Sequence, residues 1–195
     1  MFTGIIEAIG TVKKISHLGT NITFEIDSEI SNELKVDQSV SHNGVCLTVE
    51  KTAKNRHWVT AVEETLVKSN LDSIQVQNSM NLERCMAMNG RLDGHIVQGH
   101  VDQIATCIKK NIKDGSVDFT FEYDPSLGNV TVEKGSISIN GVSLTCFNSQ
   151  ENQFTVTIIP YTLEHTNFKS LEENDLVNLE FDIIGKYVSK LLNKG

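Results

Sequence analysis

The sequence predicts an all-β protein made of two tandem copies of one small antiparallel barrel, followed by a C-terminal helix. Three observations support this prediction. A stretch of the chain is repeated at constant spacing, short runs alternate apolar and polar residues, and the last residues carry a single helical apolar stripe.

The repeat is visible as two similar decapeptides. Ser39–Thr48 reads SVSHNGVCLT, and Ser136–Thr145, which starts 97 positions later, reads SISINGVSLT. The same spacing pairs Phe24–Asp27 with Phe121–Asp124, and Asn81–Glu83 with Asn178–Glu180. At the start of each copy the spacing shortens by two residues, so that Gly4 and Thr11 match Gly99 and Thr106. Because a spacing of 97 residues is too long for one unit of a solenoid, this repeat indicates a duplicated domain.

The repeat sets the expected domain boundaries. Two Asn-Gly or Asp-Gly turns, at Asn89-Gly90 and Asp93-Gly94, place the joint between the copies near residues 86–94. We therefore expect an N-terminal barrel over residues 1–90, a C-terminal barrel over residues 91–184 and a C-terminal oligomerisation helix over residues 185–195.

Within each copy the periodicity favours strands. Apolar and polar residues alternate in Val45–Val49 and in Trp58–Val62, and Phe154–Ile158 is the repeat partner of the second run. β-Branched residues dominate these runs, and turn formers separate them. Helical signal is weak, with a short turn or helix expected only in segments such as Glu64–Asn70. Because no long amphipathic helix covers a sheet face, each module is expected to close its own sheet and so remove exposed edges.

The tail differs from the modules. Its apolar residues recur at helical spacing, which places them on one face: Ile183, Ile184, Tyr187, Val188, Leu191 and Leu192. A helix of about ten residues is marginal alone, so this face must pack on something. The pattern leaves two partners open, namely the chain's own barrel or the same helix of other copies.

Composition excludes several classes of protein. Apolar residues make up 39% and charged residues 22% of the 195 residues, which is close to a globular average. The net charge of −8 argues against nucleic-acid binding. No apolar run approaches the roughly 18–20 residues of a membrane-spanning helix, and Met1–Glu7 does not resemble a signal peptide. We therefore expect a cytoplasmic protein with no membrane partner, whose four cysteines are reduced.

Few residues carry an obvious chemical signal. His95 and His100 lie in GHIVQGHVD without zinc-ligand spacing, so no metal site is expected. His95 is interpreted as a hydrogen-bonded, partly buried residue near the joint, whereas His100, between Gly99 and Asp102, suits a site. Cys46 matches Ser143 in the repeat, and both are small polar residues that suggest one pocket in each module. Asp182 matches Cys85, so the ionisable groups around the two pockets differ.

Four motifs together resemble the riboflavin synthase family of the alpha-chain type. They are MFTGIIE at residues 1–7, NGVCLT at 43–48, GHIVQGHVD at 94–102 and INGVSLT at 139–145. Each motif alone is modest, but their order and spacing are highly specific, and the resemblance covers essentially the whole chain. One position departs from the pattern, because Asn140 stands where some relatives carry Asp, and an amide cannot act as a base.

The resemblance implies a fold, an activity and an assembly. The fold would be two six-stranded Greek-key barrels and a C-terminal helix through which three chains associate as a homotrimer. The activity would be dismutation of two molecules of 6,7-dimethyl-8-ribityllumazine into riboflavin and 5-amino-6-(ribitylamino)uracil, the last step of riboflavin biosynthesis, with no metal or organic cofactor. The active site would lie between the N-terminal barrel of one chain and the C-terminal barrel of a neighbour. Association with lumazine synthase stays open.

The resemblance also assigns residues. The catalytic candidates are Cys46 and Ser39 at the acceptor substrate, His100 as a proton relay and Asp182 as an orienting charge. Substrate contacts in the N-terminal module are expected at Gly4, Ile5, Ile6, Cys46, Leu47, Thr48, Thr60, Ala61, Val62, Glu63, Glu64, Thr65, Gly99, His100 and Val101. In the C-terminal module they are expected at Lys134, Ser143, Leu144, Thr145, Ile159, Pro160, Tyr161, Thr162, Leu163 and Glu164.

Two other functions compete with this one. Lumazine-binding antenna proteins share the duplicated fold and bind lumazine or flavin without turnover, but tend to lack the equivalents of Cys46, Ser39 and His100. A cysteine-nucleophile hydrolase using Cys46 and His100 would have the right residue types but no motif. The sequence favours the enzyme over both.

Overall fold

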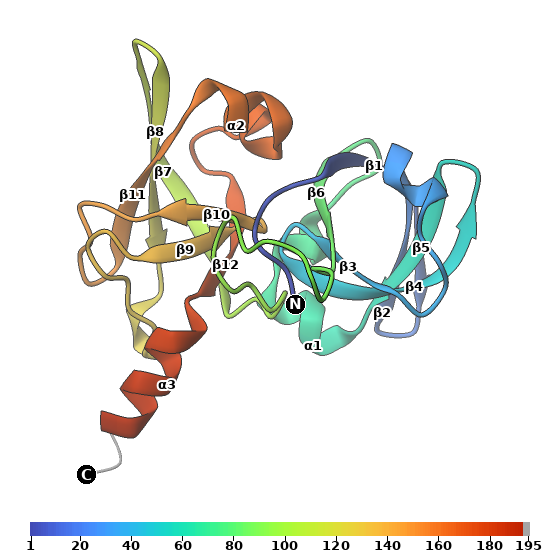
Figure 1. Cartoon of the computed structure of the whole chain (residues 1–195), viewed down its shortest axis with the longest axis horizontal. Coiled ribbons are helices and arrows are strands. Elements are labelled where there is room, and N and C mark those ends of the chain that lie inside the picture. The colour runs from blue at the N-terminus through green and yellow to red at the C-terminus, as the bar shows by residue number, and fades with distance from the viewer. Residues whose placement is uncertain (193–195) are drawn as a thin grey trace.

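The computed structural model describes residues 1–192 and contains two β modules side by side, with one helix projecting from the second (Figure 1). The N-terminal module consists of β1 (Ala8–Leu18), β2 (Asn21–Asp27), η1 (Glu29–Asn32), β3 (Ser39–His42), β4 (Val45–Ala53), β5 (Arg56–Ala61), α1 (Glu63–Lys68), η2 (Asn70–Ser73) and β6 (Ser79–Arg84). The C-terminal module consists of β7 (Gln103–Lys113), β8 (Ser116–Tyr123), η3 (Pro125–Leu127), β9 (Ser136–Ile139), β10 (Val142–Thr145), β11 (Gln153–Ile158), α2 (Pro160–His165), η4 (Asn167–Ser170) and β12 (Leu176–Phe181).

Both modules connect their strands in the same order. The N-terminal module is a closed barrel in the order β1-β2-β5-β4-β3-β6, with β1 and β6 paired to complete it. The C-terminal module is a six-stranded sheet in the order β10-β9-β12-β7-β8-β11, which is the same cyclic order. Its two end strands approach at the isolated bridge between Phe147 and Thr155 rather than along a ladder. The predicted all-β fold with a duplicated six-stranded module is confirmed.

The repeated Asn-Gly dipeptides form the same hairpin turn in each module. Asn43 and Gly44 have φ values of 48° and 81°, and Asn140 and Gly141 have 47° and 81°. Two consecutive left-handed residues match the two-residue hairpin turn that Asn-Gly favours. These turns connect β3 to β4 and β9 to β10, and so set the register of the strands that carry Cys46 and Ser143.

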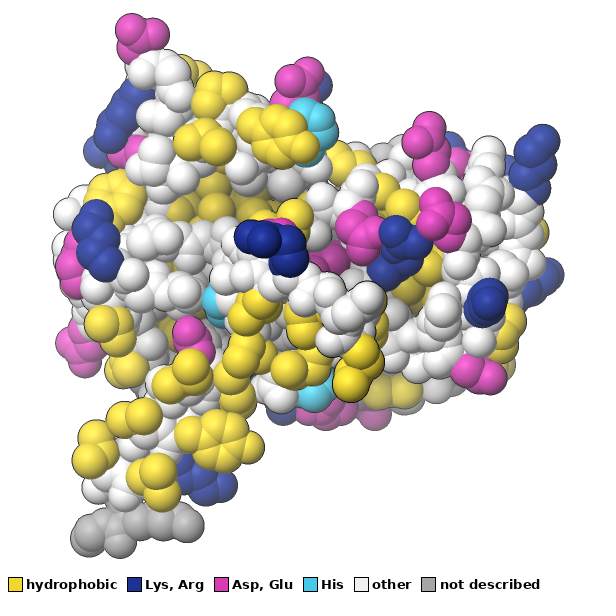
Figure 2. Space-filling view, in the orientation of Figure 1, with side chains coloured by type: hydrophobic (Ala, Val, Ile, Leu, Met, Phe, Trp, Pro, Cys, Tyr) yellow, Lys and Arg dark blue, Asp and Glu magenta, His cyan; other side chains and the backbone are white. Residues whose placement is uncertain are grey.

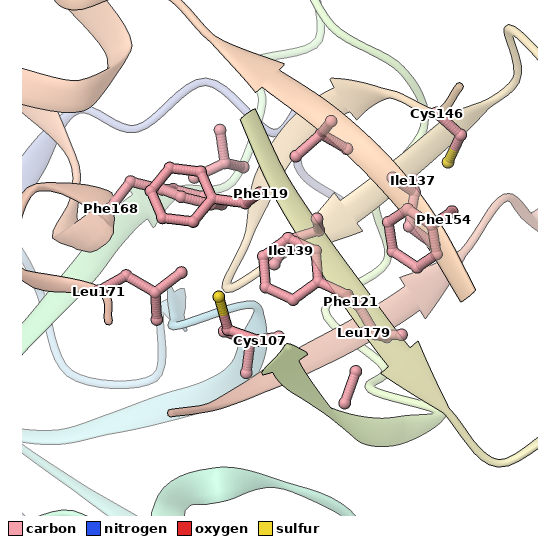
Figure 3. Close-up of a cluster of buried hydrophobic side chains, with 14 of the residues drawn as sticks. Cys107, Phe119, Phe121, Ile137, Ile139, Cys146, Phe154, Phe168, Leu171 and Leu179 are labelled. Carbon is pink, nitrogen blue, oxygen red and sulfur yellow. The ribbon is translucent and has the colours of Figure 1, made fainter. Parts of the chain in front are cut away.

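Each module has a separate apolar core, and the two cores are packed with different side chains. Aliphatic residues such as Val40, Val59 and Leu82 fill the N-terminal barrel. Aromatic rings fill the C-terminal one, where Phe119 and Phe168 meet edge to face at a centroid distance of 5.3 Å. Figure 3 shows these rings together with the thiols of Cys107 and Cys146, which lie among apolar side chains. Burial raises the pKa of Cys107 to about 11 and that of Cys146 to about 12, so both are structural thiols.

Two short segments cross from one module to the other. We call residues 2–7 the N-terminal strap and residues 97–102 the linker strap. Phe2 and Val97 pair as an antiparallel bridge between them, with N···O distances of 2.7 and 3.1 Å. Ile6 packs against the core of the C-terminal module, and Val101 packs against the core of the N-terminal barrel. Each module is therefore completed by a segment that belongs to the other half of the repeat.

Asparagines hold the two modules together with a two-fold pattern of hydrogen bonds. Asn81 Nδ2 donates to the carbonyl oxygen of Asn140 at 2.9 Å, and its repeat partner Asn178 donates to that of Asn43 at 2.8 Å. The backbone N–H groups of Asn70 and Asn167 donate to the side chains of Asn178 and Asn81, at 2.6 and 2.7 Å. Buried amides are stable only when such bonds are made, so this network fixes the relative placement of the modules.

The predicted tail helix is present as α3 (Ile183–Leu192), the longest of the helices described. Asp182 precedes it, and its Oδ1 accepts the N–H of Ile184 at 2.9 Å. Figure 2 shows apolar side chains over the projecting helix, where Ile184, Tyr187, Val188, Leu191 and Leu192 are all exposed. Within this chain the stripe is thus largely uncovered. Residues 193–195 of the predicted helix lie outside the described part of the structure.

Candidate active site

A cavity of about 340 Å³ opens on the N-terminal barrel beside α1. Six residues expected at the site line it: Cys46, Glu64, Thr65, Gly99, His100 and Val101. They come from β4, α1 and the linker strap, which are far apart in the sequence. Its lining is mostly polar, so the cavity suits a small heterocycle that carries hydrogen-bonding groups. The structure therefore brings together two candidate catalytic residues, Cys46 and His100.

Cys46 lies on β4 with its thiol on the outer face of the barrel. The register places Cys46 opposite Ser41, while the neighbouring Val45 and Leu47 face the core. The backbone N–H of Cys46 donates to the carbonyl oxygen of Gly99 at 2.8 Å. Burial raises the pKa of the thiol, and a hydrogen bond with Ser39 opposes that rise. Cys46 is therefore a protonated thiol at rest, next to the hydroxyl of Ser39.

A buried carboxylate holds the linker strap in place. Glu180 of β12 accepts the backbone N–H groups of Gln98, Gly99 and His100 at 2.6, 2.8 and 2.7 Å. Burial raises the pKa of Glu180 and these hydrogen bonds oppose the rise. Glu83 holds the N-terminal strap in the same way, through Thr3 and Gly4. The exposed side chain of His100 is thus carried at the mouth of the cavity by a rigid backbone.

The C-terminal module has a matching cavity of about 350 Å³. Six expected residues line it: Lys134, Ser143, Leu144, Thr145, Ile159 and Thr162. The N–H of Ser143 donates to the carbonyl oxygen of Gly4 at 2.8 Å, as that of Cys46 does to Gly99. Among the described residues, none lines both cavities. One chain therefore offers two related but separate pockets.

His95 is a functional candidate that the sequence did not reveal. Its Nδ1 lies 2.6 Å from Ser143 Oγ, and both side chains are half-buried. Burial lowers the pKa of His95, and the negative charge of Asp182 acts in the opposite direction. A neutral imidazole can accept the hydroxyl proton of Ser143, so the C-terminal pocket contains a hydroxyl next to a base. No sequence motif links these positions, because the pairing arises only where the joint meets β10.

The other expected residues occupy varied positions. Ile5 and Ser39 line a third cavity, beneath the residues that follow β6, and Asp182 lines a fourth beside α3. Leu47 and Ala61 are buried in the N-terminal core, and Thr60 bonds to Thr23 and Glu50. Gly4 packs on Ser143, while Ile6 and Leu163 pack on the C-terminal core. Exposed positions are held by Thr48, Val62, Glu63, Pro160, Tyr161 and Glu164.

Charged residues that the sequence reasoning missed border the N-terminal cavity. Lys68 of α1, Asp102 of the linker strap and Lys186 of α3 all line it. Lys68 pairs with Glu64 at 2.5 Å, a spacing of four residues that could have been read from the sequence. The pairing of Lys186 with Asp102 spans 84 positions and has no such signal. Over residues 1–192 no group of three or more His, Cys, Asp or Glu is arranged to hold a metal ion.

Comparison with known proteins identifies the family. The family described as the lumazine binding domain matches residues 3–85 and 98–182, once in each module. Riboflavin synthase of Bacillus subtilis (strain 168) is 40% identical over 195 residues, which is 100% of this chain and 91% of that protein. The chain belongs to the riboflavin synthase family. Riboflavin synthase of Actinobacillus pleuropneumoniae is 37% identical with the same coverage.

Solved structures agree with this family at the level of the fold. The crystal structure of LumP complexed with riboflavin superposes with a TM-score of 0.85, at 23% identity, over 93% of this chain and 99% of that one. LumP complexed with 6,7-dimethyl-8-(1'-D-ribityl) lumazine gives a TM-score of 0.83 at 21% identity, over 92% and 98%. The duplicated barrel is therefore common to riboflavin synthases and to LumP, and membership of the riboflavin synthase family rests on the sequence identity. No helix among residues 1–192 is both long and apolar enough to span a membrane.

Proposed function

We propose that the protein is a riboflavin synthase, which converts two molecules of 6,7-dimethyl-8-ribityllumazine into riboflavin and 5-amino-6-(ribitylamino)uracil by transfer of a four-carbon unit. Identity with curated riboflavin synthases over the whole chain supports the activity. The observation that carries it at the site is the Cys46 thiol, which lines the N-terminal cavity together with His100. A protein that only binds lumazine has no need of a thiol at this position.

The residues divide into chemical roles. The reaction begins with loss of a proton from the C7 methyl group of one lumazine, which the ring makes acidic. Cys46 and Ser39 would assist addition or proton transfer at the acceptor lumazine, with His100 as the proton relay. Ser143, Thr145 and Thr162 would bind the other lumazine in the C-terminal pocket. Asp182 would orient His95, whose charge state it influences.

The separation of the two pockets supports an assembly. Because no described residue lines both cavities, two lumazines bound within one chain do not share a site. The reaction needs the two in contact, so the N-terminal pocket of one chain would face the C-terminal pocket of another. The exposed apolar face of α3 supplies a surface for this contact. We propose a homotrimer, within which holding both substrates in place contributes up to roughly 7–11 kcal/mol to catalysis.

The alternative function is that of a non-catalytic antenna. LumP has the same fold and has been solved with riboflavin and with a ribityllumazine. An antenna would bind lumazine in one or both pockets and leave it unchanged. The two functions differ in one observable, which is whether riboflavin accumulates.

A direct assay decides between them. Purified protein is mixed with 6,7-dimethyl-8-ribityllumazine in the presence of a chelator and without added cofactor, and the products are separated. One riboflavin formed per two lumazines consumed is expected. Binding with a change of fluorescence but no riboflavin would contradict the enzyme and favour the antenna.

Replacing Cys46 tests the role of the thiol. Cys46→Ser keeps a small hydroxyl on β4 but changes nucleophilicity and acidity, so we expect kcat to fall about tenfold or more. Cys107→Ser is not a suitable control because Cys107 is buried in the core, whereas Cys85→Ser changes an exposed thiol. Cys85→Ser should lower kcat far less than Cys46→Ser does. An unchanged kcat in Cys46→Ser would remove this thiol from the mechanism.

The proposed function extends to the protein's location, its domains and a partner enzyme. We place the protein in the cytoplasm, where riboflavin synthesis would draw on soluble substrate. We propose the division into residues 1–90, 91–184 and 185–195 as two lumazine-binding barrels and an oligomerisation helix. We also propose a complex with lumazine synthase, the source of the substrate, which is tested by co-sedimentation of the two purified proteins.

A further inference from the structure

The first turn of α3 reaches back to the N-terminal pocket. We propose that Lys186 is a positioning residue of that pocket: its ion pair with Asp102 fixes the linker strap, which brings His100 to the cavity lined by Cys46. The proposal rests on the proposed function and adds to it a residue of the helix so far assigned only to assembly. Lys186 and Asp102 both line the cavity.

Asp102 is held from two sides. Lys186 Nζ lies 2.8 Å from Asp102 Oδ1 and 2.6 Å from Oδ2, so the ammonium bridges both oxygens. Asp102 Oδ2 also accepts the N–H of Phe181 at 2.9 Å, and the N–H of Asp102 donates to Leu179 at 2.8 Å. The end of the strap is thereby tied to β12 and to α3 at once.

The ion pair is shielded from solvent. The side chains of Lys186 and Asp102 are 25% and 20% exposed, against 54% and 70% for the nearby Lys68 and Glu64 pair. Ion pairs that are partly withdrawn from water are screened less than surface pairs, and removing one partner leaves the other charge poorly solvated. Loss of Lys186 would leave Asp102 in this position with only the more distant Lys68, whose pKa is raised chiefly by Glu64 and less by Asp102. The strap would then relax toward solvent.

A relaxed strap would disturb the site directly. Gly99 accepts the N–H of Cys46, and His100 follows it at the mouth of the cavity. A shift of the strap end therefore changes the distance between the His100 ring and the Cys46 thiol. Lys186 forms its ion pair with Asp102 and acts on Cys46 and His100 through it, while its charge also acts to lower the pKa of Glu180, which binds the same strap.

The first copy of the repeat has an equivalent ion pair at the end of its own strap. Glu7 is the repeat partner of Asp102, and Arg84 pairs with it at 2.6 Å. Both straps thus end in a carboxylate that pairs with a basic side chain. That basic residue lies at the end of the last strand of a module or just after it. In the first module the cation is on β6 itself, whereas in the second it is on α3. Only the second arrangement makes an assembly helix part of a pocket.

The test compares Lys186→Met with Lys190→Met, which removes a charge one turn further along α3. Steady-state kcat and KM for 6,7-dimethyl-8-ribityllumazine are measured with the full chain, along with the Kd for lumazine from fluorescence, the Tm and the sedimentation coefficient. We expect kcat/KM to fall about tenfold in Lys186→Met, with the sedimentation of the wild type and a Tm that is lowered because Asp102 loses its counter-charge. Lys190→Met should match the wild type, and Lys186→Arg should recover most of the loss.

A double-mutant cycle covers the case in which Lys186→Met assembles poorly. Asp102→Asn keeps an acceptor for Phe181 but loses the charge, so it should lower kcat/KM as Lys186→Met does, and the double variant should lose no more. Additive losses, a value within twofold of the wild type, or equal losses in Lys190→Met would overturn the proposal. If the wild type forms no riboflavin, the proposed function fails, and the Kd for lumazine then tests the role of Lys186 by itself. Weaker lumazine binding in Lys186→Met than in Lys190→Met would support a positioning role for Lys186. Equal Kd values would reject that role.

Discussion

At the scale of single residues, the core of the N-terminal barrel contains a buried chain of polar side chains. His42 Nδ1 lies 3.0 Å from the carbonyl oxygen of Val40, its Nε2 lies 2.8 Å from His57 Nε2, and His57 Nδ1 lies 2.8 Å from Ser31 Oγ. One set of neutral tautomers satisfies every contact: His42 donates to Val40, His57 donates to His42, and Ser31 donates to His57. The repeat partners of the two histidines are Ile139 and Phe154, so this chain belongs to the first module alone.

Acid should destabilise the N-terminal barrel through these histidines. Burial and the neighbouring His57 lower the pKa of His42 to about 3, and burial lowers that of His57 to about 4. Their unfolded pKa is near 6.5, so the unfolded chain binds more protons than the folded one between about pH 6.5 and 4. The contribution of each histidine is complete above pH 6.5 and declines by about 1.4 kcal/mol per pH unit below it. Urea unfolding at pH 7.5 and 5.5 measures the loss.

The second module provides the matched control for that experiment. The double variant His42→Ile/His57→Phe copies the residues found in the C-terminal core. It should show a flatter dependence of unfolding free energy on pH than the wild type. Equal pH dependence in the two proteins would show that other groups carry the acid sensitivity.

The contact between His95 and Ser143 leads to a second prediction at the scale of residues, which concerns turnover. His95→Gln removes a base from the hydroxyl of Ser143 while keeping a polar side chain of similar size, so we expect kcat to fall about tenfold or more. His17→Gln changes an exposed histidine on β1 and should leave kcat unchanged. Turnover by stopped-flow absorbance measures both. A wild-type rate in His95→Gln would leave the contact with Ser143 without a role in turnover.

At the scale of elements, the straps depend on close backbone approach. Gly99 has a φ of 81°, and a Cβ there would lie 2.6 Å from Cys46 Cβ and 3.0 Å from its backbone nitrogen. No other residue type allows both the left-handed conformation and this contact. The glycine is therefore what lets the linker strap lie directly on β4.

Two alanine variants separate backbone strain from contact. Gly115, in the turn between β7 and β8, has a similar φ of 84° but open space around it. Gly115→Ala should lower the free energy of unfolding by about 1 kcal/mol, through the left-handed backbone alone. Gly99→Ala should lower it by about 3 kcal/mol, because overpacking adds to that strain. If urea unfolding gave the same loss of unfolding free energy for both variants, the linker strap would be able to move away from β4 without a loss of stability.

The strands and their turns could be predicted from sequence because their signals are local. Asn43-Gly44 and Asn140-Gly141 fix a hairpin by backbone conformation alone, and Cys46 and Ser143 follow at fixed register. The exchange of straps was not predictable in this way. Val101 packs on the first barrel and Ile6 on the second, contacts that no period or propensity encodes. His95 and Lys186 stayed hidden for the same reason, since their partners are decided by how the modules meet.

At the scale of the whole molecule, the apolar face of α3 lacks a cover within the described chain. Tyr187 is 65% exposed and Leu191 is 69% exposed. Burying such residues contributes about 1.5–3 kcal/mol each, which is sufficient to drive association when several do so together. The helix projects from its module in Figure 1, which leaves this face available for the association proposed above.

Charge on that face should separate the chains. Leu191→Glu is expected to convert the assembly to monomer, because it places a carboxylate in the apolar contact. Riboflavin formation should be lost with it, since the two pockets of one chain are separate. Lys190→Glu adds the same group at the neighbouring position, outside the stripe, and should stay assembled. Sedimentation velocity at micromolar concentration measures both, and an intact trimer in Leu191→Glu would assign assembly to another surface.

The two hairpin turns meet where the modules join, and this contact limits how far the copies can diverge. A Cβ at Gly44 would lie 2.7 Å from the nitrogen of Gly141, and one at Gly141 would lie 2.8 Å from that of Gly44. The backbone of each turn packs directly against the backbone of the other. Neither glycine can be replaced by a larger residue unless the other turn moves. The interior of each barrel makes no such contact with its copy, and there the two differ: His42 and His57 stand in the first module where Ile139 and Phe154 stand in the second. The two copies are therefore alike where their backbones touch and differ where each encloses its own side chains.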